Sequence, residues 1–405
     1  MKRITTLMLA LLLVLMSFPI VANAAASSIY VGGVALKNGE YLAVDSTTPT
    51  TAKPSGGYAY YKDGVLTLSS YSYTGAGSQY MFNPNLANSS LYDTCVFSDG
   101  DLVIYCEGEN YLTNTTEYGE CISVRGNLTF TAKDEESGIG LTGAICAYVY
   151  SLDDDCELKV ESGLVVTDAI YSGFDADTLC EGKKASITVD GGNVLLMSDD
   201  YGAVAYGLEE GSAGFYMNGG SVYVNAATCG ILAESSVMSE VVVAGGELSV
   251  VANDFGIYVI SEEQYSEFYL AGGTATIVGG ENAVFAEKSY IDGSRIEAAY
   301  DAENATSEAQ GIFSGELYTS DLLEVIEGGF DTDYVLAEVP FTRGDVNDDG
   351  KIDQYDYILV KRHYFGTRIL TDSEMRPADA NDDGEVNQYD YILIKRHYFG
   401  TFTIV

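Results

Sequence analysis

Short runs of alternating apolar and polar residues recur along the middle of the chain, each following a pair of glycines. The Gly-Gly pairs begin at residues 191, 219, 245 and 272, at spacings of 28, 26 and 27 residues, and a further pair begins at 328. Alternation over a few residues predicts strands, because successive side chains on a strand point to opposite faces. A strand unit that recurs about every 27 residues predicts a repeat architecture.

A second apolar marker runs in step with the first. We interpret each period as one coil of about three short strands, because two markers share one period. In such a coil, each strand pairs with the same strand of the next coil. The markers are Ile122, Ile145, Ile170, Val204, Ile231, Ile257, Val284 and Ile312.

The predicted fold class is an all-β, right-handed parallel β-helix, or solenoid, over residues 111–340. A less regular N-terminal β cap is predicted at 25–110, because the end coil of a solenoid exposes unpaired backbone groups. The repeat is too short for a propeller blade, and a β-sandwich is the alternative fold. A small α-helical domain with two EF-hand-like loops is predicted at 341–405.

Residues 1–24 have the pattern of a secretory signal peptide. Lys2 and Arg3 precede an apolar run from Ile4 to Val21, and Ala22-Asn23-Ala24 forms a small-residue cleavage site. We expect cleavage after Ala24 and hence a secreted, extracellular protein without membrane attachment. An uncleaved anchor is the alternative, although the run is barely long enough to span a bilayer.

The region from residue 25 to 340 is strongly acidic, with 48 Asp and Glu against 10 Lys and Arg. Such a surface repels nucleic acid and anionic membranes, so neither is expected as a partner. All seven cysteines lie in this region, and we interpret them as structural because their number is odd and no spacing is typical of a zinc site. They are Cys95, Cys106, Cys121, Cys146, Cys156, Cys180 and Cys229.

One oxygen-rich pattern occurs twice near the C-terminus, at a spacing of 34 residues. Oxygen-bearing side chains alternate along each segment and a glycine stands at the sixth position, as in loops that surround calcium with about six to eight oxygens. The seventh position supplies a backbone carbonyl. The predicted ligands are Asp345, Asn347, Asp349, Lys351, Asp353 and Asp356, and then Asp379, Asn381, Asp383, Glu385, Asn387 and Asp390.

A helix is predicted after each loop, at Gln354 to Thr367 and at Gln388 to Thr401, and none is expected ahead of either loop. This doubled unit, over residues 344–401, resembles a type I dockerin, the module that attaches enzymes and binding proteins to the cohesins of a scaffoldin. The resemblance implies two bound Ca²⁺ ions and a cohesin partner. It also implies the cohesin-facing residues, which are Gln354, Tyr355, Lys361 and Arg362, and Gln388, Tyr389, Lys395 and Arg396.

The basic residues of the two predicted helices repeat as well. Lys361, Arg362 and His363 are expected to be solvated, where sequence drift costs little. They nevertheless recur as Lys395, Arg396 and His397. This identity suggests two equivalent binding faces. The alternatives are that the two copies match because the duplication is recent, and that the domain is a calcium-stabilised cap without a partner.

Residues that recur once per coil form columns with a spacing of about 4.8 Å. One position after the second marker the chain has Tyr171, Leu232, Tyr258, Phe285 and Phe313. Tyr258, Phe285 and Phe313 are the predicted carbohydrate-binding strip, because sugar rings pack on exposed aromatic faces; the alternative is that these rings lie against the core.

Acidic residues three to seven positions after the marker suggest a carboxylate column that binds further calcium. Stacked carboxylates repel one another, and bridging cations would relieve the repulsion. Ordinary solvated charges in turns are the alternative. The residues are Asp175, Asp177, Glu209, Glu210, Glu234, Glu262, Glu263, Glu287 and Glu316.

The coils also resemble the parallel β-helix carbohydrate-binding domains found beside dockerins in cellulolytic clostridia and ruminococci, through their Gly-Gly-x-apolar and Gly-Ile-Tyr segments. This resemblance implies binding of plant cell-wall polysaccharide, including acidic pectin bridged by calcium, and a role in polysaccharide catabolism within a cellulosome. No catalytic residue is assigned, since acidic pairs arise by chance and only Arg125 and Arg295 supply arginine between 25 and 340. A polysaccharide lyase or glycoside hydrolase on the same solenoid and a structural or adhesive surface protein are the alternatives.

Overall fold

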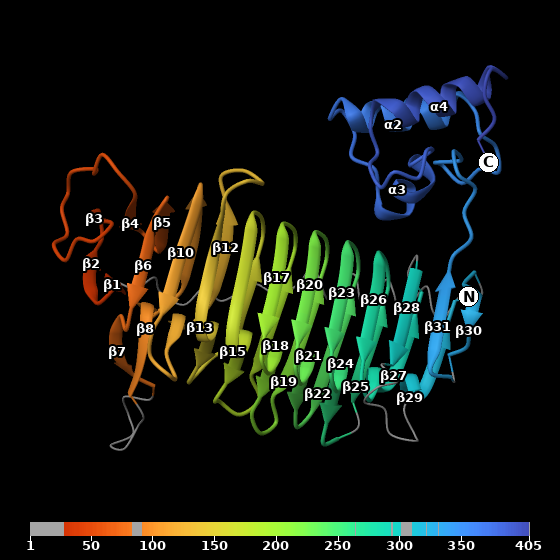
Figure 1. Ribbon diagram of the computed structural model, residues 1–405. Helices are drawn as coiled ribbons and strands as arrows, with labels where there is room; N and C mark the ends of the chain where they lie inside the picture. Colours follow the sequence, from red (N-terminus) through yellow and green to blue (C-terminus); the bar gives the residue numbers. More distant parts are fainter. Residues whose placement is uncertain are drawn as a thin grey trace.

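The computed structural model describes residues 28–82, 91–263, 265–292, 295–300, 310–320, 322–330 and 332–404 (Figure 1). The predicted signal peptide at 1–24 lies outside these residues. The described chain forms a long β-solenoid of about eight turns, followed by a small helical region. The predicted all-β solenoid is therefore confirmed.

Each turn of the solenoid crosses three faces in the same order, and on each face a strand pairs in parallel with its counterpart in the next turn. The first face contains β6 (Ser72–Gly75), β10 (Glu109–Asn114), the first halves of β13 (Gly138–Ser151) and β15 (Leu164–Thr178), β17 (Asn193–Ser198), β20 (Ser221–Ala226), β23 (Glu247–Ala252), β26 (Thr274–Gly279) and β28 (Arg295–Tyr300).

The second and third faces follow each other along the chain in every turn. The second contains β8 (Leu91–Ser98), β11 (Glu120–Arg125), the second halves of β13 and β15, β18 (Tyr201–Gly207), β21 (Cys229–Ser235), β24 (Phe255–Ser261) and the first halves of β27 (Asn282–Ile291) and β29 (Gln310–Thr319). The third contains β5 (Val65–Ser69), β9 (Leu102–Glu107), β12 (Leu128–Ala132), β14 (Cys156–Val160), β16 (Lys184–Val189), β19 (Ser212–Met217), β22 (Met238–Val243), β25 (Ser266–Leu270) and the remaining halves of β27 and β29.

Antiparallel strands close both ends of the solenoid. At the N-terminal end they are β1 (Ser28–Val31), β2 (Val34–Lys37), β3 (Glu40–Ala43), β4 (Tyr58–Lys62) and β7 (Ser78–Met81). Parallel stacking begins already with β5 against β9, so it starts at Val65, inside the segment 25–110. At the other end, β31 (Tyr334–Glu338) pairs with β28 and with β30 (Glu324–Gly328), both antiparallel.

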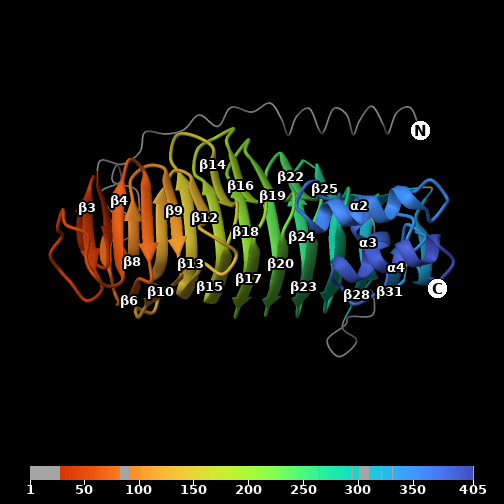
Figure 2. The same cartoon turned by 90° about the horizontal axis from the view of Figure 1, so that it is seen from above.

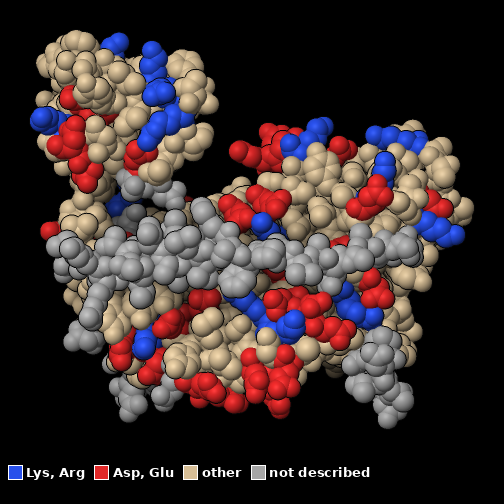
Figure 3. All heavy atoms as spheres, turned by 180° about the vertical axis from the view of Figure 1, so that it is seen from behind, with Lys and Arg blue, Asp and Glu red and all other residues tan. Residues whose placement is uncertain are grey.

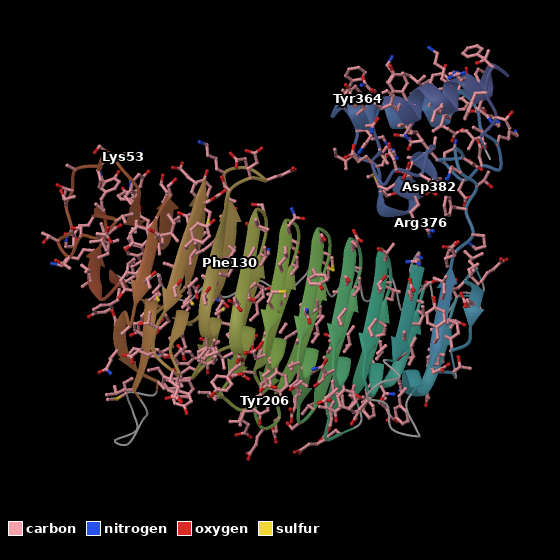
Figure 4. All side chains as sticks on the ribbon, in the orientation of Figure 1. Lys53, Phe130, Tyr206, Tyr364, Arg376 and Asp382 are labelled. Atoms are coloured by element: carbon pink, nitrogen blue, oxygen red, sulfur yellow. The ribbon has the colours of Figure 1, made fainter. Side chains whose placement is uncertain are left out.

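Columns of apolar side chains fill the interior, as Phe130 illustrates in Figure 4. On the second face the inward column runs through Ile122, Ala147, Phe174, Ala203, Ile231, Ile257, Val284 and Ile312, all buried. Three predicted markers, Ile145, Ile170 and Val204, are therefore wrong, and Ile170 is 47% exposed. The small residues Ala147 and Ala203 occupy two of these places because the large ring of Phe174 fills the interior between them.

The glycine pairs mark the turn that leads into the first face. Gly192, Gly220, Gly246 and Gly273 all have positive φ angles, between 68° and 83°. A Cβ on Gly220 would stand 2.5 Å from the carbonyl oxygen of Gly192, so the stacked turns also require glycine sterically. The pair at 328 instead belongs to the hairpin between β30 and β31 and marks no further coil.

The helical region contains α2 (Gln354–Tyr364), α3 (Asp372–Ala378) and α4 (Gln388–Tyr398). A separate core of Val346, Val360, Leu370, Ala378, Ala380 and Ile394 holds it together. It lies over the C-terminal end of the solenoid, near β28 and β31 (Figure 2). Within the part of the chain that the structure describes, every helix is too short or too polar to cross a membrane.

Acidic side chains are spread over the face of the solenoid seen in Figure 3 with Lys and Arg among them, and the helical region carries both charges. All seven cysteines are free thiols, and all except Cys180 are buried. The cysteines therefore belong to the interior packing, as expected for structural residues.

Candidate functional site

The first oxygen-rich loop is folded by hydrogen bonds to the carboxylates at its two ends. Asp345 accepts from the backbone N–H groups of Asp349 (3.1 Å) and Gly350 (2.8 Å). At the other end, Asp356 accepts from the N–H groups of Val346 (2.8 Å) and Asp353 (2.7 Å). These bonds wrap the chain around a small space bordered by oxygen atoms.

The second loop repeats this arrangement. Asp379 accepts from the N–H groups of Asp383 (3.2 Å) and Gly384 (2.9 Å), and Asp390 accepts from those of Ala380 (2.9 Å) and Asn387 (2.8 Å). Gly350 and Gly384 have φ angles of 81° and 82°, which glycine adopts without strain. The sharp turn predicted at the glycine of each loop is thus present.

The final carboxylates of the loops are the most buried acidic residues of the helical region, and Asp356 and Asp390 have no exposed surface. Burial raises the pKa of both, although backbone N–H donors oppose the shift. An ionised carboxylate in such a place needs a nearby positive charge.

The donor set of each loop fits a calcium ion by its chemistry. Hard cations prefer oxygen, and these loops mix carboxylates with Asn amide oxygens and a backbone carbonyl. In the described residues, no three Asp, Glu, His or Cys side chains form a metal cage by themselves. The loops would therefore hold calcium through the mixed oxygen set, with Asp345 and Asp356, or Asp379 and Asp390, at the two ends.

Both predicted helices after the loops are present, and each begins with a reciprocal cap. They end at Tyr364 and Tyr398, three residues before the predicted ends at Thr367 and Thr401. Asp353 and Asn387 accept from the N–H groups of Tyr355 (2.7 Å) and Tyr389 (2.8 Å). The expectation that no helix precedes either loop is wrong for the second one, because α3 ends directly before Asp379. Its first turn is stabilised by Glu374, which accepts from the N–H of Thr371 at 2.9 Å.

The residues expected to face a cohesin are exposed on α2 and α4. Tyr355 is 58% exposed and Tyr389 is 59% exposed, so the two copies present equivalent surfaces. The structure adds two exposed apolar pairs to the same helices and their ends, Ile358 with Ile392 and Phe365 with Phe399. The remaining exposed members of the predicted set are Gln354, Lys361, Arg362, Gln388, Lys395 and Arg396.

The histidines differ from expectation, since they are only partly exposed. Nδ1 of His363 accepts from the N–H of Leu370 at 3.1 Å, and Nδ1 of His397 accepts from that of Ile404 at 3.0 Å. Each histidine therefore holds the segment that follows its helix against that helix by a hydrogen bond. The solvated position predicted for His363 is wrong for this reason.

The predicted aromatic strip on the second face is assembled. The ring centroid of Phe285 lies 5.0 Å from that of Tyr258 and 4.9 Å from that of Phe313. Phe255 extends the strip by stacking on Tyr258 at 4.5 Å. Tyr171 lies outside this column, because the register places Asp175 there instead, and its ring stacks on that of Tyr118 at 6.2 Å. Phe313 is 42% exposed.

The predicted carboxylate column is not continuous. Asp177 and Glu234 stand in one column, but Tyr206 lies between them and Ile260 follows. Glu316 lies opposite Lys288 rather than opposite another acid. Asp177, Glu234 and Glu316 therefore belong to no continuous acidic ladder.

Three acidic residues near the N-terminal cap have raised pKa values. Burial raises the pKa of Glu120 to about 7 and that of Asp177 to about 6, and burial also raises the pKa of Asp175. Glu120 accepts from the Tyr80 hydroxyl at 2.7 Å. The tyrosines Tyr80, Tyr148 and Tyr150 pack together over this part of the second face. The carboxyl groups thus lie under aromatic side chains rather than in an open cleft.

Comparison with known families places the C-terminal region. The family model of the type I dockerin domain matches residues 343–398. No curated protein matches the chain significantly. The match spans both oxygen-rich loops and all three helices, and residues 343–398 of this chain are therefore a type I dockerin domain.

Proposed function

We propose that this protein is a secreted component of a cellulosome that attaches to a scaffoldin cohesin through its dockerin and binds plant cell-wall polysaccharide through its solenoid. Type I dockerin domains bind calcium and occur in extracellular cellulosome components, with cohesins as their partners. The signal peptide predicted at 1–24 agrees with export.

The observation that carries the docking role is the pair of matched loop-and-helix units. Both loops offer the same oxygen donors in the same hydrogen-bonded frame. In the proposed complex, each bound calcium fixes the helix that follows its loop. The residues Tyr355 and Tyr389, with the basic pairs one to two turns later, then contact the cohesin.

The polysaccharide-binding role rests on the shape and surface of the solenoid. Its stacked strands form an elongated surface, and the strip of Tyr258, Phe285 and Phe313 lies on the second face. Phe285 stacks on Phe313, whereas Tyr258 meets Phe285 edge to face. Because these contacts cover parts of the ring faces, the outer face of Phe313, the last and most exposed ring, is the surface best placed for a sugar. A lyase, a glycoside hydrolase and an adhesive surface protein are the competing assignments.

Two measurements on the mature chain test this proposal. Capture by immobilised cohesin is expected in calcium and is expected to disappear in chelator. Affinity electrophoresis in gels that contain pectin, xylan or soluble cellulose derivatives is expected to show retardation. Release of reducing ends or of unsaturated products from these polymers would show that the solenoid is an enzyme, a glycoside hydrolase or a lyase, rather than a binding domain. Absence of retardation by every polymer would remove the polysaccharide role and leave only docking.

A further inference from the structure

Two adjoining hollows lie on the outer surface of the first face, where β10, β13 and β15 run side by side. Their volumes are about 310 Å³ and 290 Å³, and Thr142 and Asp168 line both. Together they form a groove along the first half of β13, which we call the β13 groove. This half, from Gly138 to Ala144, gives the groove a length of about 20 Å.

Glycine on β13 lines the groove where the neighbouring strands carry larger side chains. Tyr111, Gly140 and Val166 are opposite one another in three successive turns. In the two following turns the same column continues with Leu195 and Tyr223. Large side chains therefore occupy this column again beyond Val166. The missing side chain of Gly140 therefore leaves room for the ring of Tyr111, which lies over it, and the hollow lies beside this ring.

Tyr111 forms an aromatic wall of the β13 groove. It is 53% exposed, and its ring leans over Gly140, where a Cβ would lie 2.9 Å from the ring carbon Cδ1. Its hydroxyl donates to Glu109 at 3.0 Å, which fixes the direction of the ring. An exposed ring held in one orientation, beside polar groups, is typical of small-molecule sites.

The charged groups of the groove are acidic along its whole length. Glu109 and Glu136 line one end, Asp168 lies in the middle, and Glu117 and Asp199 line the other end. Among the described residues that line the two hollows there is no Lys or Arg. The groove therefore repels anionic ligands, while its carboxylates can accept hydrogen bonds from hydroxyl groups.

We infer that the β13 groove binds a short stretch of an uncharged polysaccharide, with a sugar ring against Tyr111 and sugar hydroxyls donating to Asp168 and its acidic neighbours. This inference rests on the proposed polysaccharide-binding function and specifies its ligand class. It favours neutral chains over pectin, because each uronate would face a carboxylate in a groove without a basic residue.

Three single variants of the mature chain test the groove. Thr142→Tyr fills it from an exposed position on β13, and Tyr111→Ala removes its aromatic wall. Tyr223→Ala is the matched control, since Tyr223 lies in the same outward column two turns beyond Val166 and is 37% exposed. Thermal unfolding of each variant confirms that it is folded.

Affinity electrophoresis and calorimetry with a neutral β-glucan, and with polygalacturonate in the presence and absence of calcium, provide the readout. We expect the neutral polymer to be bound more tightly, with the dissociation constant raised about tenfold or more by Thr142→Tyr and Tyr111→Ala and unchanged by Tyr223→Ala. Equal binding by all variants would overturn the groove and leave the proposed function intact. Tighter binding of polygalacturonate would overturn the ligand class, and failure of the unaltered chain to bind any polymer would overturn the proposed function itself.

Discussion

Arg376 of the dockerin forms an ion pair with Glu338 at the end of the last solenoid strand, with 2.8 Å between Nη2 and Oε2. The guanidinium of Arg376 also lies over the ring of Phe341, 4.5 Å from its centroid. Arg295 of β28 approaches the same Glu338 carboxylate at 4.0 Å. Figure 4 shows Arg376 on the side of the dockerin that faces the solenoid. These contacts join the two domains across a very short connection.

Replacing Arg376 by Ala is expected to loosen the dockerin from the solenoid. The side chains of Arg376 and Glu338 are each 26% exposed, so the free energy of unfolding is expected to change by less than about 1 kcal/mol. Small-angle X-ray scattering is expected to show a larger maximum dimension. Arg343→Ala is the control, because its partner Asp382 lies within the dockerin. Identical scattering curves for both variants would contradict this role of the ion pair.

Calcium removal is expected to unfold the dockerin and spare the solenoid, because the loops depend on a cation to neutralise their carboxylates. Limited trypsin digestion followed by mass spectrometry measures this directly. In chelator, cleavage is expected after Lys361, Arg362, Lys395 and Arg396, while residues before 338 stay protected. The double variant Asp345→Ala with Asp379→Ala is expected to behave this way even in calcium.

Asp348→Asn provides the matched control for that experiment. Asp348 lies in the first loop at a non-ligand position with a φ angle of 53°, which Asn tolerates. Its protection from trypsin in calcium is expected to equal that of the unaltered chain. A dockerin that stays protected in chelator would refute the calcium-dependent fold.

The two dockerin faces are expected to substitute for each other. Tyr355→Ala or Tyr389→Ala alone leaves one complete face, so cohesin affinity is expected to fall only about twofold, the statistical factor. The double variant is expected to lose at least about a hundredfold, since both faces then lack an exposed aromatic anchor. Calorimetry with a cohesin that binds the unaltered chain measures these affinities. A large loss of affinity in either single variant would show that only one face is used.

Glu120 is expected to make the stability of the N-terminal turns depend on pH. Its pKa is raised to about 7 in the folded chain by burial, above its ordinary value of 4.5. The folded state therefore takes up a proton at higher pH than the unfolded state, and stability rises as the pH falls from above 7 towards 4.5. The contribution is at most about 3 kcal/mol.

Glu120→Gln is the variant that isolates this effect, because Gln keeps an oxygen that can accept from Tyr80. Urea unfolding at pH 5 and pH 8 measures it. The unaltered chain is expected to lose more stability between pH 5 and pH 8 than the variant does. An equal pH dependence in both proteins would show that Glu120 is not the responsible group.

The dockerin was predictable in detail because its duplication doubles every signal. Each oxygen ligand, glycine and basic pair occurs twice at the same spacing, so a chance pattern is excluded. Helix α3 was not predictable in this way, since it has no counterpart before the first loop. It is short and contains Pro377, which lacks a backbone N–H and disfavours a helix interior.

The solenoid was predictable in its period but not in its register. The stacked turns demand glycine, so Gly192, Gly220, Gly246 and Gly273 keep their spacing. The inward column tolerates any apolar volume that fills the local space, and it holds Ala147 and Ala203 on either side of Phe174. An outward Ile145 or Ile170 beside an inward alanine misleads a search for the most apolar position. Register shifts at the corner of β13, between Gly143 and Ile145, add to the error.

The β13 groove could not be derived from sequence for a related reason. In a sequence, a glycine within a strand indicates only a residue that destabilises the strand. The strand register is needed to place Gly140 between Tyr111 and Val166. Likewise, burial raises the pKa of Glu120, and the sequence alone does not show that Tyr80 lies against this carboxyl group, from a strand 40 residues earlier in the chain.

The join at Glu338 gives the molecule a mechanical property. When a dockerin is joined through a long flexible linker, the attached domain can occupy many positions around the scaffold. A contact worth less than about 1 kcal/mol still favours the orientation in which the dockerin lies against the last coil. In the proposed complex, the stacked coils would then extend about 40 Å for eight layers, and a polysaccharide bound along them would be presented in a preferred orientation to neighbouring subunits.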